Sequence, residues 1–476
     1  MSREYKFLVG EQWRVSQEAI EIRSPYSGEV VGVTYQATPQ EVEQAIQAAC
    51  RAFEETRLLP TYRRVEILER IAQAIKSSQE ELARLIALEA GKPIKTARAE
   101  VSRAVATFTD GLEESKRIRG EWLPLDLDAG SAGRFALVRR FPVGPVAAIT
   151  PFNFPLNLVA HKLAPALACG ASVVLKPAPQ APLSALNLAR IIQEAGAPAG
   201  AVNVLPCSVE AAQPLVSDDR LKILSFTGSA AVGWALKQKA GKKRVVLELG
   251  GNAGVAIHSD ADLDYAAERC AVGGFSYAGQ SCIAVQRIYI HRPVFEAFTG
   301  KLLRRVSQFK LGDPLEEATD IGPMISPQAA ERAEGWIQEA VRGGAKLLIG
   351  GQRDGSFLQP TVLTNTRPEM SVCREEVFSP LVAVEPYDDL PAALLAINNS
   401  AYGLQAGIFT NDFQAVFHAF ETLDVGGVIV NEVPTYRADP MPYGGMKDSG
   451  LGREGVRYAI EEFTERKVLV VNLRQP

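Results

Sequence analysis

A cysteine in a small, flexible turn is the first side chain with an obvious chemical use. Cys282 follows Gly279-Gln280-Ser281, and a cysteine thiolate is a strong nucleophile where it is partly exposed and has room to attack. A lone cysteine, however, is more often a small buried side chain than a catalyst. The turn alone therefore leaves nucleophilic catalysis as one of two interpretations.

A carboxylate stands at the end of an apolar run. Glu248 lies between Leu247 and Leu249, where burial would raise the pKa of its carboxyl group towards neutrality, as a general base requires. The alternative is an ion pair with a nearby lysine or arginine, because an unpaired buried charge is costly. The sequence favours neither interpretation.

Asn153 is held between aromatic residues and prolines in the segment Thr150-Pro151-Phe152-Asn153-Phe154-Pro155. A rigid amide N–H is a suitable donor to an oxyanion that develops during a reaction. The alternative is an asparagine that only stabilises a turn.

A possible anion site is predicted at Gly228-Ser229, where an apolar run ends and a helix begins. Backbone N–H groups and a hydroxyl at a helix start suit a phosphate. The spacing from Gly228 to Gly233 is not the G-x-G-x-x-G pattern, so this segment alone is weak evidence for a dinucleotide. Lys176 follows another apolar run in the same way.

Composition excludes several classes of protein. The 476 residues are 47% hydrophobic and carry 51 basic against 55 acidic side chains, so we expect a folded protein that binds neither nucleic acid nor an anionic membrane. Six scattered cysteines without a C-x-x-C pair predict free thiols, and their spacing to the four histidines predicts no metal site. No signal peptide or apolar stretch of ~18 residues is evident, so we expect a cytoplasmic location.

Hydrophobic periodicity predicts the elements that must position these residues. Helices are expected at 38–53, where Thr38 and Glu41 suggest a capping box, at 62–90, with Ser77-Ser78 as a candidate break, and at 94–117. From residue 143 short apolar runs alternate with helices, which is typical of a doubly wound parallel sheet with ligands at the carboxyl ends of its strands. The expected strands are 146–150, 172–175, 202–205, 223–226 and 245–249, and the expected helices are 155–168, 182–195, 208–217 and 229–240. Beyond residue 250, helices are expected at 262–280, 293–308 and 327–343, with strands at 284–290 and 346–349.

Together these segments resemble the aldehyde dehydrogenase superfamily in their order and spacing. The resemblance covers essentially the whole chain. Each motif is weak evidence alone, but the agreement of all of them in order and spacing is strong evidence. The motifs are Thr150–Pro155, Leu175–Pro177, Phe226–Ser229, Leu247–Gly251, Gly279–Cys282, Glu375–Phe378 and Pro442–Gly445.

The resemblance implies an α/β fold with two doubly wound parallel-sheet domains and a small β arm. A Rossmann-like NAD(P)-binding domain would comprise residues 1–118 and 143–250, and a catalytic domain residues 251–447. Residues 119–142 and 463–476 would form an oligomerisation arm of a homotetramer or homodimer.

The resemblance also implies a mechanism. Cys282 would attack an aldehyde, the Asn153 side chain and the Cys282 N–H would hold the oxyanion of the thiohemiacetal, and hydride would pass to NAD or NADP. Glu248 would then activate the water that hydrolyses the thioester. The cofactor would contact Thr150, Pro151, Phe152, Lys176, Gly228, Ser229, Glu376 and Phe378.

One departure from the family bears on the cofactor. Pro179 stands where many NAD-preferring members carry a glutamate that holds the ribose hydroxyls. Without that carboxylate a 2′-phosphate is not repelled, and Lys176 could attract it. We therefore expect NADP to be accepted.

Three positions that line the substrate tunnel in the family carry Arg103, His161 and Arg437 here. Guanidinium groups suit a carboxylate, phosphate or phosphonate, so a small anionic or polar aldehyde is expected. The pattern is similar to the branch with lactaldehyde, phosphonoacetaldehyde and non-phosphorylating glyceraldehyde-3-phosphate dehydrogenases. Surface or ion-paired arginines are the alternative.

Two other functions stay open. Semialdehyde dehydrogenases that transfer the acyl group to coenzyme A generally lack a glutamate at the position of Glu248, so its presence favours hydrolysis. A catalytically silent binding protein on the same fold is the other alternative, and the joint presence of Cys282, Glu248 and Asn153 argues against it.

Overall fold

The apolar runs after residue 143 form parallel strands in a computed structural model that describes residues 3–473. They lie in an eight-stranded sheet with the order β24-β12-β11-β8-β9-β10-β2-β3, in which the five central strands are parallel. The strands are β2 (Phe7–Val9), β3 (Gln12–Arg14), β8 (Val146–Ile149), β9 (Val173–Lys176), β10 (Val202–Val204), β11 (Ile223–Thr227), β12 (Arg244–Glu248) and β24 (Gly450–Leu451).

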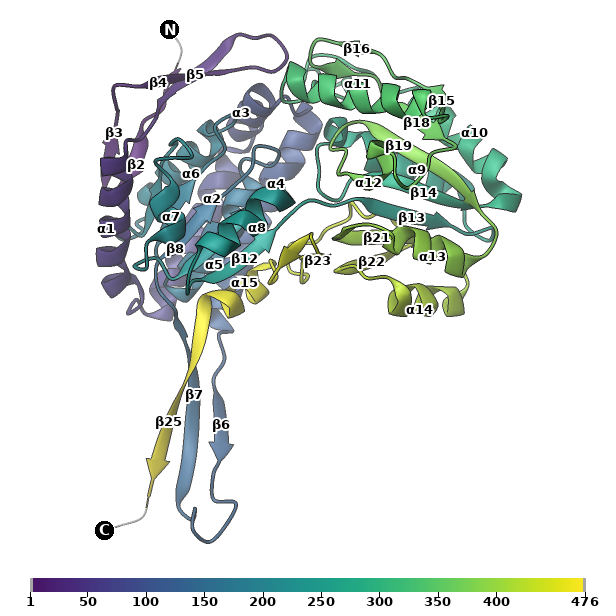
Figure 1. The fold of residues 1–476 in the computed structure, drawn as a ribbon. Coiled ribbons are helices and arrows are strands. Elements are labelled where there is room, and N and C mark those ends of the chain that lie inside the picture. Colours follow the sequence, from purple (N-terminus) through teal and green to yellow (C-terminus); the bar gives the residue numbers. More distant parts are fainter. Residues whose placement is uncertain (1–2, 474–476) are drawn as a thin grey trace.

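Helices from both ends of the chain pack along this sheet (Figure 1). Both halves of the predicted capping box at α1 are present, because Thr38 accepts from the Glu41 N–H and the Glu41 side chain accepts from the Thr38 N–H. The helices are α1 (Pro39–Thr56), α2 (Thr61–Ser77), α3 (Gln79–Ala90), α4 (Ile94–Lys116), α5 (Asn157–Cys169), α6 (Leu183–Glu194), α7 (Gln213–Ser217), α8 (Ala230–Lys239) and α15 (Val456–Phe463).

A seven-stranded sheet with the order β15-β18-β19-β14-β13-β21-β22 forms the second unit, and all its pairs except β15–β18 are parallel. Two parallel sheets with helices confirm the predicted α/β class. The strands are β13 (Ala253–Ile257), β14 (Val285–His291), β15 (Lys346–Ile349), β18 (Thr361–Thr364), β19 (Leu381–Tyr387), β21 (Gln405–Phe409) and β22 (Gly427–Val430), and the helices are α9 (Leu263–Phe275), α10 (Phe295–Val306), α11 (Pro327–Arg342), α12 (Ser371–Arg374), α13 (Leu390–Asn398) and α14 (Phe413–Thr422).

Short strands complete the chain. Near the N-terminus β1, β4 and β5 form a small sheet of their own. No helix among residues 3–473 has the length and apolarity of a membrane span. The remaining strands are β1 (Arg3–Glu4), β4 (Ala19–Arg23), β5 (Val30–Tyr35), β16 (Arg353–Asp354), β17 (Phe357–Leu358), β20 (Tyr402–Gly403) and β23 (Met446–Lys447).

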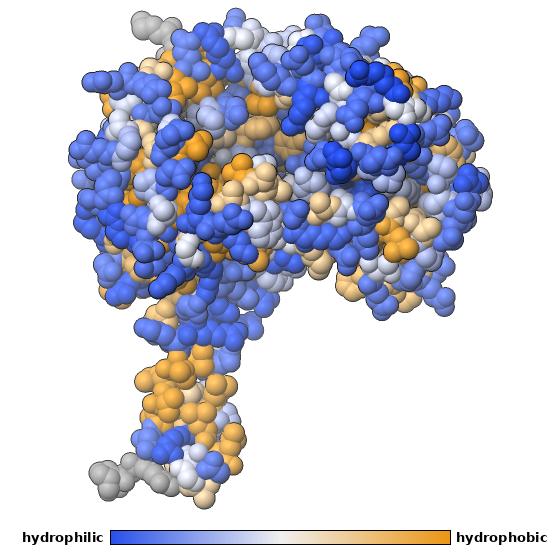
Figure 2. Space-filling model, in the orientation of Figure 1, coloured by the Kyte–Doolittle hydropathy of each residue, from blue (hydrophilic) through white to orange (hydrophobic). Residues whose placement is uncertain are grey.

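A three-stranded arm projects from the first unit (Figure 1). It pairs β6 (Glu121–Pro124), β7 (Arg134–Pro142) and β25 (Thr464–Asn472) in antiparallel register, so segments from opposite ends of the sequence lie side by side. Figure 2 shows that hydrophobic residues cover the middle of the arm on the face in view. The domain boundaries proposed from the sequence stay a prediction.

Two expected helices are shorter than the sequence predicts. The helix expected at 208–217 comprises only Gln213–Ser217, because Pro214 has no N–H for a preceding turn and is tolerated only in the first turn of a helix. The helix expected at 262–280 ends at Phe275. Tyr277 and Ala278 beyond it have φ of +51° and +52°, a left-handed conformation that no helix contains.

A buried ion pair joins the segments that carry Asn153 and Cys282. Lys92 is paired with Glu100, and its Nζ lies 3.7 Å from the centre of the Phe154 ring and 4.5 Å from that of Tyr277. Phe154 adjoins Asn153, and Tyr277 belongs to the turn before Cys282. The ammonium group therefore attracts an aromatic ring from each segment.

The Glu100 carboxylate also fixes the start of α5. Glu100 accepts hydrogen bonds from the N–H groups of Leu156 and Asn157, at 2.9 and 3.1 Å. These two N–H groups would otherwise be unsatisfied at the helix start. Glu100 therefore holds both Lys92 and the backbone just after Asn153.

We predict that Glu100→Gln destabilises the fold by about 3–5 kcal/mol, because it leaves the Lys92 ammonium buried without a counter-charge. Burial already lowers the pKa of Lys92 to about 8. In the variant, Lys92 therefore loses its proton, and with it the unpaired buried charge, as the pH rises. The fall in the thermal unfolding midpoint should therefore be larger at pH 6 than at pH 9. The double variant Lys92→Met/Glu100→Gln should recover part of the loss, and equal midpoints for Glu100→Gln and the unsubstituted protein would contradict the prediction.

Candidate active site

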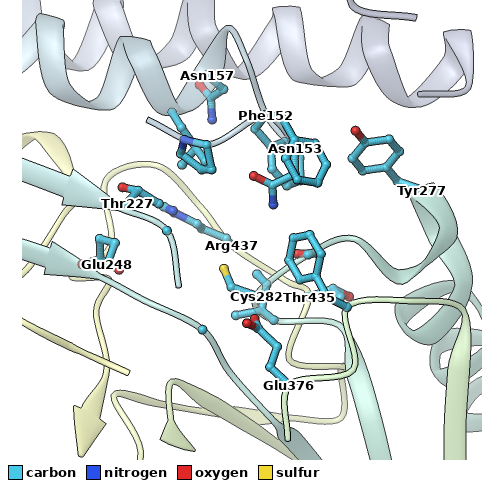
Figure 3. A pocket seen from close by; sticks show the side chains of 18 of the residues that line it. Phe152, Asn153, Asn157, Thr227, Glu248, Tyr277, Cys282, Glu376, Thr435 and Arg437 are labelled. Carbon is cyan, nitrogen blue, oxygen red and sulfur yellow. The ribbon is translucent and has the colours of Figure 1, made fainter. Parts of the chain in front are cut away.

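A cavity of about 430 Å³ lies where β8, β11 and β12 end and the turn before β14 begins. Its lining brings together Asn153, Glu248 and Cys282, which lie 95 and 34 positions apart in the sequence. Figure 3 shows the sulfur of Cys282 between the side chains of Asn153 and Glu376. The three residues proposed as catalytic thus share one cavity.

Cys282 is a half-buried thiol in a turn whose shape needs a glycine. Gly279 has φ of +66°, and a Cβ there would lie 2.1 Å from the carbonyl oxygen of Ser379. The Cys282 Sγ is 3.2 Å from the Tyr443 hydroxyl. Burial raises the pKa of Cys282 to about 12, so the resting group is a thiol that must lose its proton before it attacks.

Asn153 is tied to the turn that carries the nucleophile. Its Nδ2 donates to the carbonyl oxygen of Gln280 at 3.0 Å. Its Oδ1 is buried and has no hydrogen-bond partner among the described residues. The amide is therefore fixed beside Cys282, and the interpretation as an asparagine that only stabilises its own turn loses support.

Glu248 ends β12 as a buried carboxyl group, 3% exposed, with both oxygens unpartnered in the described part of the chain. No ion pair joins it to a lysine or arginine there. Burial and the negative charge of Glu454 raise the pKa of Glu248 well above its ordinary value. This environment is that of a general base rather than of a salt-bridged glutamate.

The cofactor residues expected from the sequence divide into two groups. Those that line the cavity are Pro151, Phe152, Gly228, Ser229, Glu376 and Phe378. Thr150 directly follows β8 and Lys176 ends β9, and neither lines this cavity. Lys176 is buried, and burial lowers its pKa.

Two contacts shape the side of the cavity where a nicotinamide would lie. Glu376 accepts from the Gly251 N–H at 3.1 Å, and burial raises its pKa to about 7. A Cβ on Gly250 would lie 2.4 Å from the Glu376 carboxylate, so a larger residue there would displace that carboxylate. The ring of Phe378 packs edge-on against Phe152 with centroids 6.0 Å apart.

The residues at the start of α8 fit a dinucleotide phosphate. Ser229 precedes the helix, and its hydroxyl does not cap it. The Thr227 hydroxyl is buried without a partner among the described residues. Free hydroxyls and N–H groups at a helix N-terminus bind anions well, and the cavity is continuous from there to Cys282.

Arg103 and Arg437 line the same cavity, whereas His161 does not. Arg103 forms an ion pair with Asp439 at 2.7 Å. His161 lies behind the wall, 2.9 Å from Asp439 and within 3.5 Å of the Arg437 guanidinium. Neither arginine is on the outer surface, and both have acidic partners that the sequence analysis did not identify.

Arg437 is the more enclosed of the two arginines, with a side chain that is 6% exposed against 30% for Arg103. Its Nη2 donates to Glu454 at 3.1 Å, and its guanidinium lies 3.6 Å from the centre of the Tyr443 ring. Its Nε is buried and unpartnered in the described chain. Glu454 also pairs with Lys162 at 3.4 Å.

Sequence reasoning therefore missed Tyr443 as the partner of Cys282, together with Asp439 and Glu454. Tyr443 belongs to one of the seven motifs, but its contact with Cys282 spans 161 positions of the sequence. The sequence does offer a signal for Glu454, because this carboxylate lies between two glycines, Gly452 and Gly455, in a short segment.

Comparison with known proteins agrees with this geometry. The profile of the aldehyde dehydrogenase family matches residues 13–469. The chain is 46% identical to the 3-sulfolactaldehyde dehydrogenase of Priestia aryabhattai over 472 residues, which cover 99% of this chain and 98% of that protein.

Two solved structures have nearly the same fold. Aldehyde dehydrogenase 21 from Physcomitrella patens, in complex with the reaction product succinate, has a TM-score of 0.97 and 44% identity and covers 99% of both chains. Glyceraldehyde-3-phosphate dehydrogenase from Methanocaldococcus jannaschii, complexed with NADP, has a TM-score of 0.93 and 39% identity and covers 96% of this chain and 100% of that one.

We predict that alkylation of Cys282 by iodoacetamide in the cofactor-free protein accelerates about tenfold per pH unit from pH 7 to 10, because only the thiolate reacts and the raised pKa keeps its fraction small. An ordinary thiol, such as glutathione treated alongside, should level off above about pH 9. Mass spectrometry of the peptide that contains Cys282 gives the rate. A plateau for Cys282 below pH 9 would show that the resting thiol is not the form inferred.

Proposed function

The chain belongs to the aldehyde dehydrogenase family, and we propose that it oxidises a small aldehyde with an acidic group at its far end to the carboxylate, using NAD or NADP. The observation that carries this proposal is the presence of Arg103 and Arg437 in the cavity that also holds Cys282. Guanidinium groups bind carboxylate, sulfonate and phosphate groups through paired hydrogen bonds.

The first part of the reaction is attack on the carbonyl carbon. The Cys282 thiol loses its proton, and its sulfur bonds to that carbon to give a thiohemiacetal. The oxyanion is held by the Asn153 amide, which the Gln280 carbonyl keeps in place, together with the Cys282 N–H. When bound, the oxidised nicotinamide supplies a hydride acceptor.

The second part releases the acid. Loss of hydride leaves a thioester on Cys282, and Glu248 removes a proton from the water that attacks it. The unpartnered, buried carboxyl group of Glu248 supports this role. It also argues against the alternative in which coenzyme A takes the acyl group, since no base is needed to activate water in that reaction. The intact set of Cys282, Asn153 and Glu248 argues against a silent binding protein.

The relatives support an acidic substrate. The Priestia enzyme is named for a sulfonated aldehyde, and the Methanocaldococcus enzyme is named for a phosphorylated aldehyde. The Physcomitrella enzyme is bound to a dicarboxylate product. All three compounds place an acidic group a few atoms from the reacting carbon. A cavity with two arginines beside the nucleophile suits that arrangement.

We infer that NADP is accepted as well as NAD. Pro179 is exposed just beyond the buried Lys176, where a glutamate would repel a 2′-phosphate. The NADP complex of the Methanocaldococcus enzyme supports this inference.

The arm supports a homodimer or homotetramer. Trp122, Val468 and Leu469 on its strands are 59–62% exposed, and an exposed apolar strand at a sheet edge is stable when a second chain covers it. A second copy of this chain is the proposed partner. The cytoplasmic location expected from the sequence stays a prediction.

We predict that Arg103→Gln lowers kcat/KM for succinate semialdehyde at least tenfold, and for neutral propionaldehyde by less than about threefold, because only the former presents a charge to the guanidinium. NAD(P)H formation at 340 nm gives both rates. Arg98→Gln is the matched control, since Arg98 lies on the same helix but pairs with Glu80 and Glu317 at the surface. Equal losses for both aldehydes would refute a role of Arg103 in binding the acidic group.

We predict that the unsubstituted enzyme reduces both NAD and NADP and that Pro179→Glu lowers kcat/KM for NADP at least tenfold while NAD is retained. The new carboxylate repels a 2′-phosphate but suits free ribose hydroxyls. Pro179→Gln, which adds the same bulk without charge, is the control. Strict use of NAD by the unsubstituted enzyme would rule out the inferred dual use.

A further inference from the structure

The charge of Arg103 is already compensated by Asp439. The Arg103 Nη2 is 2.7 Å from Asp439 Oδ1, and its Nε is 3.4 Å from Oδ2. The Asp439 side chain is only 6% exposed and is not part of the cavity lining. An acidic ligand that reaches Arg103 therefore meets a guanidinium that shares its charge with a buried carboxylate.

His161 adds no positive charge. Its Nε2 lies 2.9 Å from Asp439 Oδ1, and the Arg437 Nη2 lies 3.4 Å from Nε2 and 3.5 Å from Nδ1. The Asp439 carboxylate only accepts, so Nε2 donates to it, and a second positive charge on the ring would be repelled by the adjacent guanidinium, so the ring is a neutral imidazole. Burial and the charge of Arg437 lower the pKa of His161 in agreement with this assignment.

The groups around Arg437 leave a single positive charge. Arg437 and Lys162 both pair with Glu454, at 3.1 and 3.4 Å. Two cations and one carboxylate sum to one positive charge, and Arg437, whose Nε has no partner among the described residues, places that charge at the cavity wall. Glu248 and Glu376, the carboxyl groups of the cavity, are neutral or negative and add no further positive charge.

We propose that Asp439 sets the charge of the substrate that this site accepts: aldehydes that end in a singly charged carboxylate or sulfonate are preferred over those that end in a doubly charged phosphate or phosphonate. The proposal rests on the proposed function, namely oxidation of an acidic aldehyde in this cavity. A second negative charge would have to be buried without a matching cation, which is strongly unfavourable. Asp439 is thus a specificity-determining residue that acts through Arg103 and His161.

The test compares two aldehydes of the same shape and different charge, sulfoacetaldehyde and phosphonoacetaldehyde, at pH 8.5 with saturating cofactor. The unsubstituted enzyme should have a kcat/KM at least tenfold higher for the sulfonate. In Asp439→Asn the charge of Arg103 is no longer compensated, so the ratio of the two kcat/KM values should fall by about tenfold or more. Asp439→Glu keeps the charge and should keep the ratio.

The ratio of the two kcat/KM values measured on one variant does not depend on the fraction of that variant that is active. The same ratio measured on the unsubstituted enzyme tests the proposal even where a variant does not fold. Equal use of both aldehydes by that enzyme, or an unchanged ratio in folded Asp439→Asn, would overturn the role of Asp439. Propionaldehyde separates this failure from that of the proposed function. If both acidic aldehydes are poorer substrates than propionaldehyde, the acidic substrate class itself is wrong.

Discussion

A buried guanidinium is the constraint on which the rest of the active site depends. Arg437 is enclosed between Glu454, at 3.1 Å, and the face of Tyr443, at 3.6 Å. A charge in such a place is tolerated only with hydrogen-bonded compensation. The segment that carries these three residues is held at the edge of the first sheet, where β24 pairs with the strand that ends in Glu248. The Tyr443 hydroxyl consequently reaches the Cys282 sulfur.

Ion pairing with Lys162 and Arg437 also gives two neighbouring carboxyl groups, Glu454 and Glu248, different pKa values. Lys162 and Arg437 stabilise the charge of Glu454 and lower its pKa to about 2, whereas Glu248, which has neither partner, has a pKa well above its ordinary value. Two carboxyl groups whose environments drive their pKa values apart identify which one accepts a proton near neutral pH. Because Glu454 forms ion pairs with both cations, Glu248 has no counter-charge and is the group that can act as the base.

The parts of this site that the sequence could predict are those with a local cause. The five parallel strands of the first sheet and most helices follow from periodicity, although the sequence predicts only two strands of the second sheet. Asn153, Glu248 and Cys282 each stand out against their immediate neighbours. Asp439 does not, because it lies in an irregular segment and its partner Arg103 is 336 positions away. Without that distant contact the sequence leaves open whether the two arginines are ion-paired, whereas the structure has one compensated arginine and one in a network with net positive charge.

The failed helix prediction before Cys282 has a physical reason of the same kind. Hydrophobic spacing would continue α9 to residue 280, but Tyr277 and Ala278 are left-handed, and Phe378 across the cavity is as well, with φ of +49°. Such conformations persist only where surrounding contacts impose them. Here the Tyr277 hydroxyl donates to the Ala90 carbonyl at 2.9 Å, and its ring faces the Lys92 ammonium. A helix through this turn would break both contacts and turn Cys282 away from Asn153, so the strain is the cost of placing the nucleophile in the cavity.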